Sequence, residues 1–309
     1  MNRILSKLTT KPVWWWERKR GYPIRSRFNQ LPPLPVNTGR TRFAVLATPE
    51  TLCDAFWAAW SWYRFLRDED CRLQIAVDGA VSELDRAAAS ELFPGVSIES
   101  TEWACNYVRP RVPGIQSFFD THPMGRKLAL ILALSDLGPL VYSDQDVLAF
   151  RRPSEVIGAL GGNVPHYFAE EVDGARDMQI AQRAKQLDLD YLPRFNSGFL
   201  YIPQGALSIR LAGQILATWH ARGDLWFTEQ TVLSFMLQRL GAEALPESGY
   251  VISNRRQFYW EEDVDYSAIT ARHFTGTVRH VMYKYGLPTI LKQSKDHCGA
   301  ERADATETM

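Results

Sequence analysis

The chain has 309 residues, of which 46% are hydrophobic, 12% aromatic and 23% charged, the proportions of a globular protein with room for one large domain or two modest ones. Formal charge sums to zero, but residues 1–42 carry ten Lys and Arg against one acid, so +9, and the other 267 residues carry −9. A basic arm on an acidic body indicates contact with an anionic surface or a solvated tail, and we expect no nucleic-acid partner.

Membrane spans and disulfide scaffolds are not indicated. No apolar run reaches the roughly 18 residues that a span needs. The N-terminus lacks the apolar core of a signal peptide. Four cysteines, with no CxxC pair and no Cys/His spacing of a zinc site, indicate reduced thiols. We therefore expect a cytoplasmic protein.

Residues 1–41 have the composition of a basic, aromatic and proline-rich arm. Tryptophans at 14–16 stand beside the cations at 18–20, which suits peripheral contact with the inner face of a membrane. The alternative is that these tryptophans pack the arm onto the folded domain. The proline-rich stretch 31–39 continues neither a helix nor a sheet interior, so we expect the domain to cover 42–290.

Strands and helices alternate in the first half of the domain. Apolar runs ending in turn residues predict strands at 43–48, 71–79, 96–100 and 139–150, and helical spacing predicts helices at 50–66, 81–93 and 125–138. This alternation is typical of an α/β fold with a mostly parallel central sheet flanked by helices. Ligands of such sheets bind beyond the carboxyl ends of the strands.

The second half is less regular. We expect a turn and strand at 194–203, helices at 206–223 and 227–241, short strands or extended loops at 250–260 and 271–276, and a disordered polar tail at 291–309.

Two aspartates, Asp144 and Asp146, follow a buried strand in the segment VYSDQDVLAF. Carboxylates at i and i+2 of a straight strand face opposite sides, but at a strand end that bends into a turn both can converge on one cation. Mg²⁺ and Mn²⁺ prefer such oxygen ligands. The alternative is a solvated turn. His273 is a candidate third ligand or a structural histidine, and Arg279 could neutralise a phosphate.

These motifs, in this order, resemble those of GT-A fold glycosyltransferases, most of all the retaining family of bacterial galactosyltransferases and glycogenin. The resemblance covers roughly residues 43–285. It rests on Lys127 in a helix, DQD at 144–146, FNSG at 195–198, TEQ at 228–230 and HFTGTVR at 273–279. It implies a GT-A-like fold, with a Rossmann-like nucleotide-binding half and an acceptor-binding half.

The resemblance also implies roles for individual residues. Asp144, Asp146 and His273 would hold Mn²⁺ or Mg²⁺, and Glu229 with Gln230 would stand near the reacting carbon of the sugar. Donor contacts would come from Ala47, Thr48, Asp78, Lys127, Asp144, Gln145, Asp146, Asn196, Ser197, Gly198, Gly276 and Arg279. The implied reaction is metal-dependent transfer from a nucleotide-diphosphate sugar, a UDP-sugar above all, to a glycan, lipid-linked or protein acceptor.

Some positions depart from the family pattern, and other interpretations stay open. The family's first strand ends in an acid that contacts the base, where this chain has Pro49, and Arg279 and Glu229 replace a lysine and an aspartate. Lys127 could instead be an exposed helix residue, 196–198 an ordinary turn and Glu229 a helix-capping acid. The rival functions are a GT-A-like binding domain without catalysis, a haloacid-dehalogenase-type phosphohydrolase and a nucleotidyltransferase.

Overall fold

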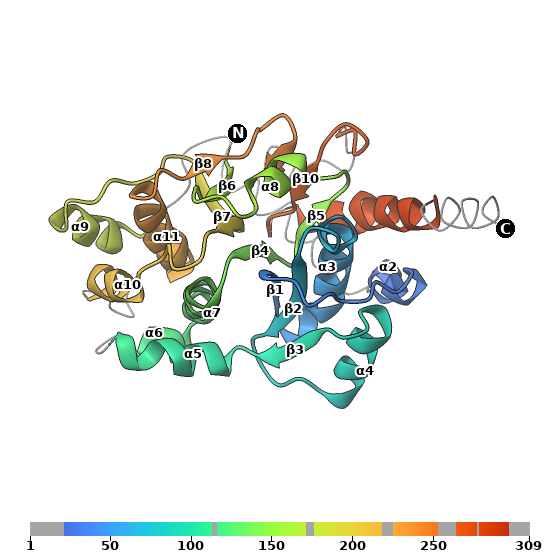
Figure 1. Cartoon of the computed structure of the whole chain (residues 1–309), viewed down its shortest axis with the longest axis horizontal. Helices are drawn as coiled ribbons and strands as arrows, with labels where there is room; N and C mark the ends of the chain where they lie inside the picture. The colour runs from blue at the N-terminus through green and yellow to red at the C-terminus, as the bar shows by residue number, and fades with distance from the viewer. Residues whose placement is uncertain are drawn as a thin grey trace, which may run out of the picture.

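A central sheet of seven strands, in the order β3-β2-β1-β4-β7-β6-β8, lies between layers of helices, and a three-stranded sheet, β5-β10-β9, lies beside it (Figure 1). The computed structural model describes residues 22–112, 116–170, 176–217, 225–252, 264–276 and 278–296. The strands are β1 Thr41–Ala47, β2 Cys71–Val77, β3 Ser97–Ser100, β4 Leu140–Asp144, β5 Val147–Ala149, β6 His166–Ala169, β7 Phe195–Ile202, β8 Glu243–Ala244, β9 Tyr250–Ile252 and β10 Ala271–His273.

The large sheet is parallel through its first four strands. β1 pairs in parallel with β2 and β4, and β2 pairs in parallel with β3, whereas β7 runs antiparallel to both β4 and β6. The mostly parallel α/β sheet expected from the sequence is therefore confirmed. Because β1, β2 and β4 run the same way, their carboxyl ends meet at one edge, where Asp78 and Asp144 lie.

The strand predicted over 139–150 is wrong as a single element. β4 ends at Asp144, a turn covers residues 145–146, and the chain re-enters a strand as β5. β5 belongs to the small sheet, where it pairs antiparallel with β10. The DQD segment is thus the point at which the chain passes from one sheet to the other.

The long helices agree with the predicted ranges, and most short ones were not predicted. The helices with described bounds are α2 Pro23–Ser26, α3 Leu52–Leu66, α4 Glu83–Leu92, α5 Glu102–Val108, α6 Gln116–Thr121, α7 Pro123–Leu137, α8 Ser154–Ala159, α9 Met178–Gln186, α10 Ile209–Leu216, α11 Thr228–Gln238 and α12 Arg279–Val281. Short 3₁₀ segments η1 Arg27–Gln30, η2 Pro49–Thr51, η3 Arg109–Arg111 and η4 Leu225–Phe227 and a π-helical segment η5 Met282–Gly286 complete the set.

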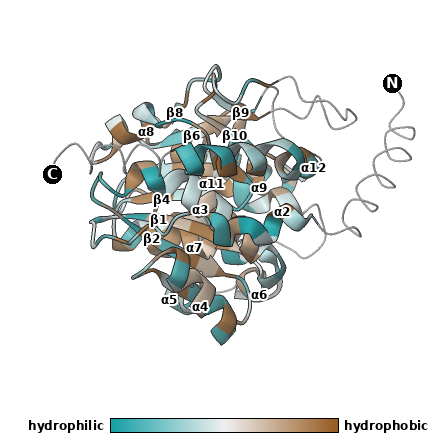
Figure 2. Ribbon diagram, turned by 90° about the vertical axis from the view of Figure 1, so that its right-hand side faces the viewer, coloured by the Kyte–Doolittle hydropathy of each residue, from teal (hydrophilic) through white to brown (hydrophobic). Residues whose placement is uncertain are grey.

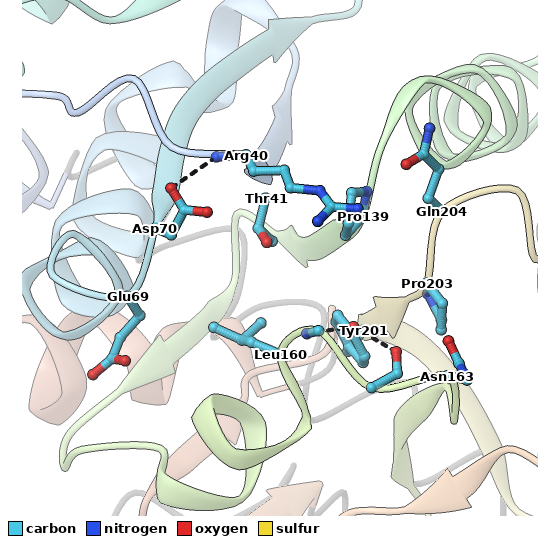
Figure 3. A pocket seen from close by; sticks show the side chains of 12 residues that line it. Arg40, Thr41, Glu69, Asp70, Pro139, Leu160, Asn163, Tyr201, Pro203 and Gln204 are labelled. Carbon is cyan, nitrogen blue, oxygen red and sulfur yellow. Dashed lines mark hydrogen bonds between the residues drawn. The ribbon is translucent and has the colours of Figure 1, made fainter.

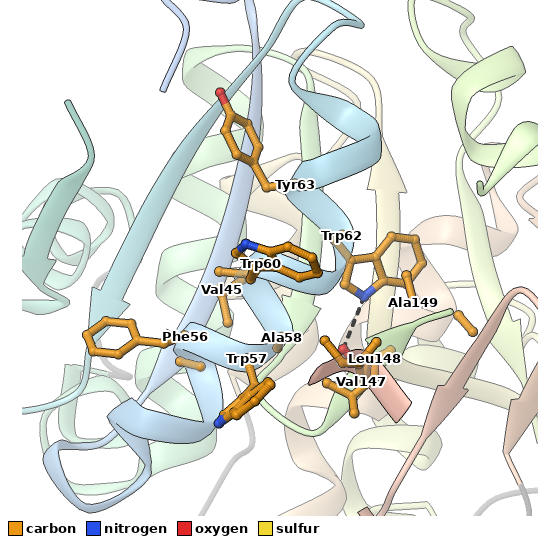
Figure 4. Close-up of a cluster of buried hydrophobic side chains, with 14 of the residues drawn as sticks. Val45, Phe56, Trp57, Ala58, Trp60, Trp62, Tyr63, Val147, Leu148 and Ala149 are labelled. Atoms are coloured by element: carbon orange, nitrogen blue, oxygen red, sulfur yellow. Dashed lines mark hydrogen bonds between the residues drawn. The ribbon is translucent and has the colours of Figure 1, made fainter. Parts of the chain in front are cut away.

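Two hydrophobic cores lie on the two faces of the large sheet. α3 covers one face with Trp57, Trp60 and Trp62, all fully buried (Figure 4). The Trp62 indole donates to the carbonyl of Val147 at 3.0 Å, which fastens β5 to α3. α7 covers the other face and is mainly hydrophobic in Figure 2. The turn at 145–146 therefore joins two packed strands: β4, which contributes to both cores, and β5, which is bonded to α3.

Part of the expected arm packs on the domain. Leu31 and Leu34 are buried in the same hydrophobic core as α3, and Trp60 donates to the carbonyl of Pro32 at 2.9 Å. Arg25 donates to the carboxylate of Asp54 at 2.7 and 3.1 Å. Residues 22–40 therefore belong to the folded body. The tryptophans at 14–16, and with them both interpretations of the basic arm, lie outside the described residues.

The C-terminal prediction is wrong for residues 291–296. These residues continue a helix that runs through 287–296, in which Leu287, Ile290, Leu291 and Ser294 recur at helical spacing on one buried face. Residues 297–309 lie outside the described range. None of the described helices combines the length and the apolar character needed to cross a bilayer.

Candidate functional site

The turn after β4 brings together the two aspartates that the sequence singles out. Asp144 is the last residue of β4 and Asp146 lies in the turn, and their carboxylates together with the His273 imidazole offer ligand atoms all within 4.8 Å of one another. The bend at the strand end allows this convergence, which a straight strand would prevent.

His273 reaches Asp146 because β10 is tied to the turn. His273 stands opposite Val147 in the β10–β5 ladder, and the amide of Phe274 donates to the carbonyl of Asp146 at 2.8 Å. The imidazole Nε2 then lies 3.3 Å from Asp146 Oδ1. Two sheets therefore each contribute part of one side-chain cluster.

Asn196 sets the orientation of the His273 ring. The amide of Gly198 donates to Asn196 Oδ1 at 2.8 Å, which identifies that atom as the carbonyl oxygen. His273 Nδ1 lies 3.0 Å from the same oxygen, so Nδ1 carries the proton and donates. Nε2 faces the aspartates, so it is the ring atom that would bind a metal, as in a metal-binding histidine supported by a second residue. Two carboxylates and this imidazole fit Mn²⁺ or Mg²⁺.

Arg279 contacts the same aspartate. Its Nη2 makes a short ion pair with Asp146 Oδ2. Burial would raise the pKa of Asp146, but the positive charge of Arg279 and the contact with His273 outweigh burial and hold that pKa well below its usual range. The Arg279 guanidinium thus keeps the Asp146 carboxylate ionised. The same planar group of N–H donors is suited to binding a second anion, such as a phosphate.

A buried network lies beside the cluster. Lys127, only 4% exposed, donates to Asp144 Oδ2 at 3.0 Å and to Ser197 Oγ at 3.2 Å. Its Nζ lies 3.6 Å from Glu229 Oε1, and Tyr142 donates to Asp144 Oδ1 at 2.5 Å. Burial would lower the pKa of Lys127, but the two carboxylates outweigh it and raise the pKa. Lys127 is therefore a buried cation, and the interpretation of it as an exposed helix residue is wrong.

Glu229 and Gln230 face the same network from the first turn of α11. Ser197 donates from Oγ to Glu229 Oε2 at 3.1 Å and from its amide to Gln230 Oε1 at 3.3 Å. Burial raises the pKa of Glu229 to about 7, although Lys127 acts to lower it. Glu229 Oε1 and Gln230 Nε2 are buried and have no hydrogen-bond partner among the described residues. Such atoms are free to bond a polar ligand.

These side chains line one cleft of about 490 Å³. Of the residues predicted from the sequence it contains Lys127, Asp144, Asn196, Ser197, Gly198, Glu229, Gln230, His273 and Gly276. Asp146 and Arg279 stand beside it through their contacts with His273 and with each other. Met124, Glu170, Trp226, Phe227 and Thr275 complete the lining. The motifs quoted from the sequence assigned no role to any of these five.

Three predicted donor residues lie elsewhere. The described residues that line the cleft do not include Ala47, Thr48 or Asp78, which stand at the carboxyl ends of β1 and β2. The Thr48 amide bonds the Thr51 hydroxyl at 2.9 Å as a helix cap, and Asp78 pairs with Arg126 at 2.6 Å. Gln145, partly exposed in the turn, is also outside the lining. Their assignment to donor binding stays a prediction.

A second hollow, of about 480 Å³, lies at the opposite ends of the strands (Figure 3). Arg40 and Thr41 line it at the start of β1, and the Tyr201 hydroxyl bridges the amide of Gly161 and the carbonyl of Gly162. None of the residues predicted to act on a donor lines it. The candidate chemistry is therefore gathered at the carboxyl ends of the strands, as expected for an open α/β sheet.

No family model and no curated protein matches the sequence. Solved structures do resemble the fold. A WbbM bifunctional glycosyltransferase, in its apo form, gives a TM-score of 0.53 at 14% identity, covering 79% of this chain and 47% of that one. The galactosyltransferase LgtC, in complex with donor and acceptor sugar analogues, gives 0.51 at 16% identity, covering 82% and 95%. This chain thus spans about half of the WbbM chain. It has the GT-A-like α/β fold of these glycosyltransferase structures.

Proposed function

We propose that the protein is a metal-dependent glycosyltransferase that moves a sugar from a nucleotide-diphosphate sugar, a UDP-sugar above all, to an acceptor hydroxyl. The single observation that carries the proposal is the convergence of Asp144, Asp146 and His273 at one edge of a GT-A-like sheet, beside the buried Lys127 and Glu229. The two similar structures are a bifunctional glycosyltransferase and a galactosyltransferase, which supports the same reaction class.

Asp144, Asp146 and His273 would hold Mn²⁺ or Mg²⁺, which supplies positive charge to the diphosphate of the donor and stabilises the departing nucleotide. Arg279 adds a fixed positive charge next to Asp146 and would bind the diphosphate with its planar fork. No neighbouring atom lies within 4 Å of the position that a Cβ on Gly276 would occupy, so this glycine leaves room for those phosphates.

The buried polar groups would bind and orient the transferred sugar. Lys127, Ser197 and Glu229 hold one another rigidly, so they are positioned before a donor arrives. Glu229 Oε1 and Gln230 Nε2 offer an acceptor and a donor to sugar hydroxyls. Glu229 also lies where it could stabilise the positive charge that develops on the sugar ring. The retaining outcome is proposed from the resemblance of the motifs to the retaining family.

The test is a panel of nucleotide sugars, each with Mn²⁺, screened for protection against thermal unfolding. A ligand at 100 times its dissociation constant adds about 2.7 kcal/mol to the free energy of unfolding. Asp144→Asn and Asp146→Asn should remove the metal-dependent shift and the transfer activity, and EDTA should do the same to the wild type. Transfer that is fully retained in EDTA would refute the proposal.

We further propose that the tryptophans at 14–16 and the cations at 18–20 make peripheral contact with an anionic membrane. The matched experiment compares the full chain with a chain lacking residues 1–21, which keeps Arg25 and its partner Asp54. The full chain should sediment with phosphatidylserine vesicles and the shortened one should not. Equal sedimentation of the two chains would contradict membrane contact.

A further inference from the structure

The mouth of the cleft carries an exposed indole. Trp226 is 62% exposed and is the only aromatic among the five large hydrophobic side chains that stand out into solvent in the described part of the chain. Met124 and Phe227 line the cleft next to it. A large apolar ring left in water at the rim of a binding cleft is a surface that a ligand can cover.

The position of this indole is fixed by its neighbours. η4 leads directly into α11, so Trp226 stands three residues before Glu229. Its ring meets His122 at 5.6 Å in an edge arrangement, and His122 stacks on the fully buried Phe118 at 5.9 Å. Burial lowers the pKa of His122, so this support is uncharged at neutral pH. The indole is thus held in place by uncharged rings and presents an apolar face to solvent.

The depth of the neighbouring groups indicates which ligand meets Trp226. Lys127, Ser197 and Glu229 are 4%, 4% and 1% exposed, so they form the floor of the cleft, where the donor sugar is proposed to lie. The nucleobase end of a donor would extend toward β1 and β2, whose terminal residues Ala47 and Asp78 do not line the cleft. A molecule that enters from solvent therefore meets Trp226 before it reaches the floor.

We propose that Trp226 is the platform for a pyranose ring of the acceptor, so that the acceptor is a saccharide and not a polypeptide side chain. This inference rests on the proposed function. The axial C–H bonds of a pyranose form an apolar face that packs on an indole, while its hydroxyls stay free for polar groups. The cleft supplies such a group in the Glu170 carboxylate, which lines it and is intermediate in burial between the indole and the floor residues.

Fluorine NMR of the full chain labelled with 5-fluorotryptophan tests the contact directly. Ten tryptophans are present, and the Trp226 signal is the one lost in Trp226→Phe. With Mn²⁺ and UDP bound, the probes are methyl α-D-glucopyranoside, methyl β-D-galactopyranoside, lactose, maltose and a peptide with serine and threonine. At least one saccharide should shift the Trp226 signal, and the peptide should not. The Trp103 signal, from a partly exposed indole that lines a different hollow, is the internal control.

Variants distinguish an acceptor saccharide from the nucleotide and from a peptide as the ligand that contacts Trp226. Trp226→Ala should weaken binding of that saccharide about tenfold, as expected for loss of one stacked ring, and leave the affinity for UDP with Mn²⁺ unchanged. Trp103→Phe should change neither. A shift caused by the peptide alone would overturn the inference, and so would a loss of UDP affinity in Trp226→Ala. Saccharide binding in a protein that transfers no sugar would instead overturn the proposed function and uphold the platform.

Discussion

Gly198 shows how one residue without a side chain shapes the candidate metal site. A Cβ at this position would lie 2.4 Å from His273 Cε1 and 2.5 Å from Nδ1, far closer than real atoms approach. The imidazole therefore occupies the space that any other residue would fill. The glycine of the FNSG motif is thus explained by the position of the histidine, and not by a turn that requires positive φ.

Gly198→Ala should accordingly displace His273 and weaken metal binding by at least about tenfold, with a loss of about 1–3 kcal/mol of stability from overpacking. The measurement is a titration with Mn²⁺ followed by electron paramagnetic resonance of the free ion, with urea unfolding in parallel. Gly158→Ala, in α8, is the matched control because nothing lies within 4 Å of its Cβ. Metal binding unchanged in Gly198→Ala would contradict the assignment of His273 as a ligand.

The pKa of Glu229 predicts a pH dependence of stability. Burial raises this pKa from 4.5 to about 7 in the folded chain. Between these two values the folded state binds more protons than the unfolded state, so stability falls as the pH rises through the window, by about 3 kcal/mol in all. Glutamine has no proton to lose. The free energy of unfolding of Glu229→Gln, minus that of the wild type, should therefore increase by this amount from pH 4.5 to pH 8.

Urea unfolding at several pH values, in the presence of a chelator, measures this difference. The exposed Glu243→Gln controls for the removal of one negative charge from the acidic body of the protein. A difference that stays constant across the window would show that the Glu229 carboxyl titrates in the folded chain as it does in the unfolded chain.

At the scale of single residues, the sequence identified most polar members of the cleft. Asp144, Asn196, Glu229 and His273 were found because their motifs occur in a fixed order along the chain. The contacts that define their state were not predictable. Tyr142, which donates to Asp144, reads as an ordinary strand residue, and only the fold shows that its hydroxyl points to a carboxylate.

At the scale of elements, the N-terminal segment is fastened to the domain by a buried carboxylate. Asp54, in the first turn of α3, is fully buried and accepts bonds from Arg25 of α2 and from the Tyr283 hydroxyl of η5 at 2.9 Å. Tyr22 packs on Tyr283, with ring centroids 4.3 Å apart. One acid thus joins both ends of the described chain to the same helix.

Arg25→Ala should destabilise the protein by about 3 kcal/mol, because it leaves a buried charge without its main partner. The exposed Arg27→Ala, two residues away, should change stability by less than about 0.5 kcal/mol. Urea unfolding at neutral pH gives both numbers. Adding Asp54→Asn to Arg25→Ala should recover part of the loss. Equal stability of the two single variants would mean that the segment is held by its apolar contacts alone.

The elements that the sequence predicted share a physical property. α3, α7 and α11 are 11 to 15 residues long, and each presents enough regularly spaced apolar residues to be recognised. α6 and α8 have six residues each, too few for a periodic pattern. Their helical state depends on the neighbours against which they pack, which a single sequence does not contain.

At the scale of the whole molecule, the candidate metal site joins two sheets that the sequence did not separate. Predicting one strand over 139–150 concealed the passage from the large sheet to the small one, because both halves of that stretch are apolar. The turn can form a metal site because it lies where the two sheets meet. Asp144 ends a strand of the large sheet, and His273 ends a strand of the small one.

A ligand that bonds to both sheets should therefore slow their local opening together. Hydrogen exchange measured by mass spectrometry, with and without Mn²⁺ and UDP, should show slower exchange in 140–149 and in 271–276. α4 contacts the outermost strand β3 through the bond from Arg86 to the carbonyl of Ile98, and only its Ala89 and Leu92 are buried. It should keep its exchange rate, because its opening leaves the site intact. If only 140–149 were protected, His273 would not be a ligand, and metal would bind to the aspartates alone. If both segments are protected in the wild type and neither is protected in Asp146→Asn, the joint protection depends on the carboxylate in the turn.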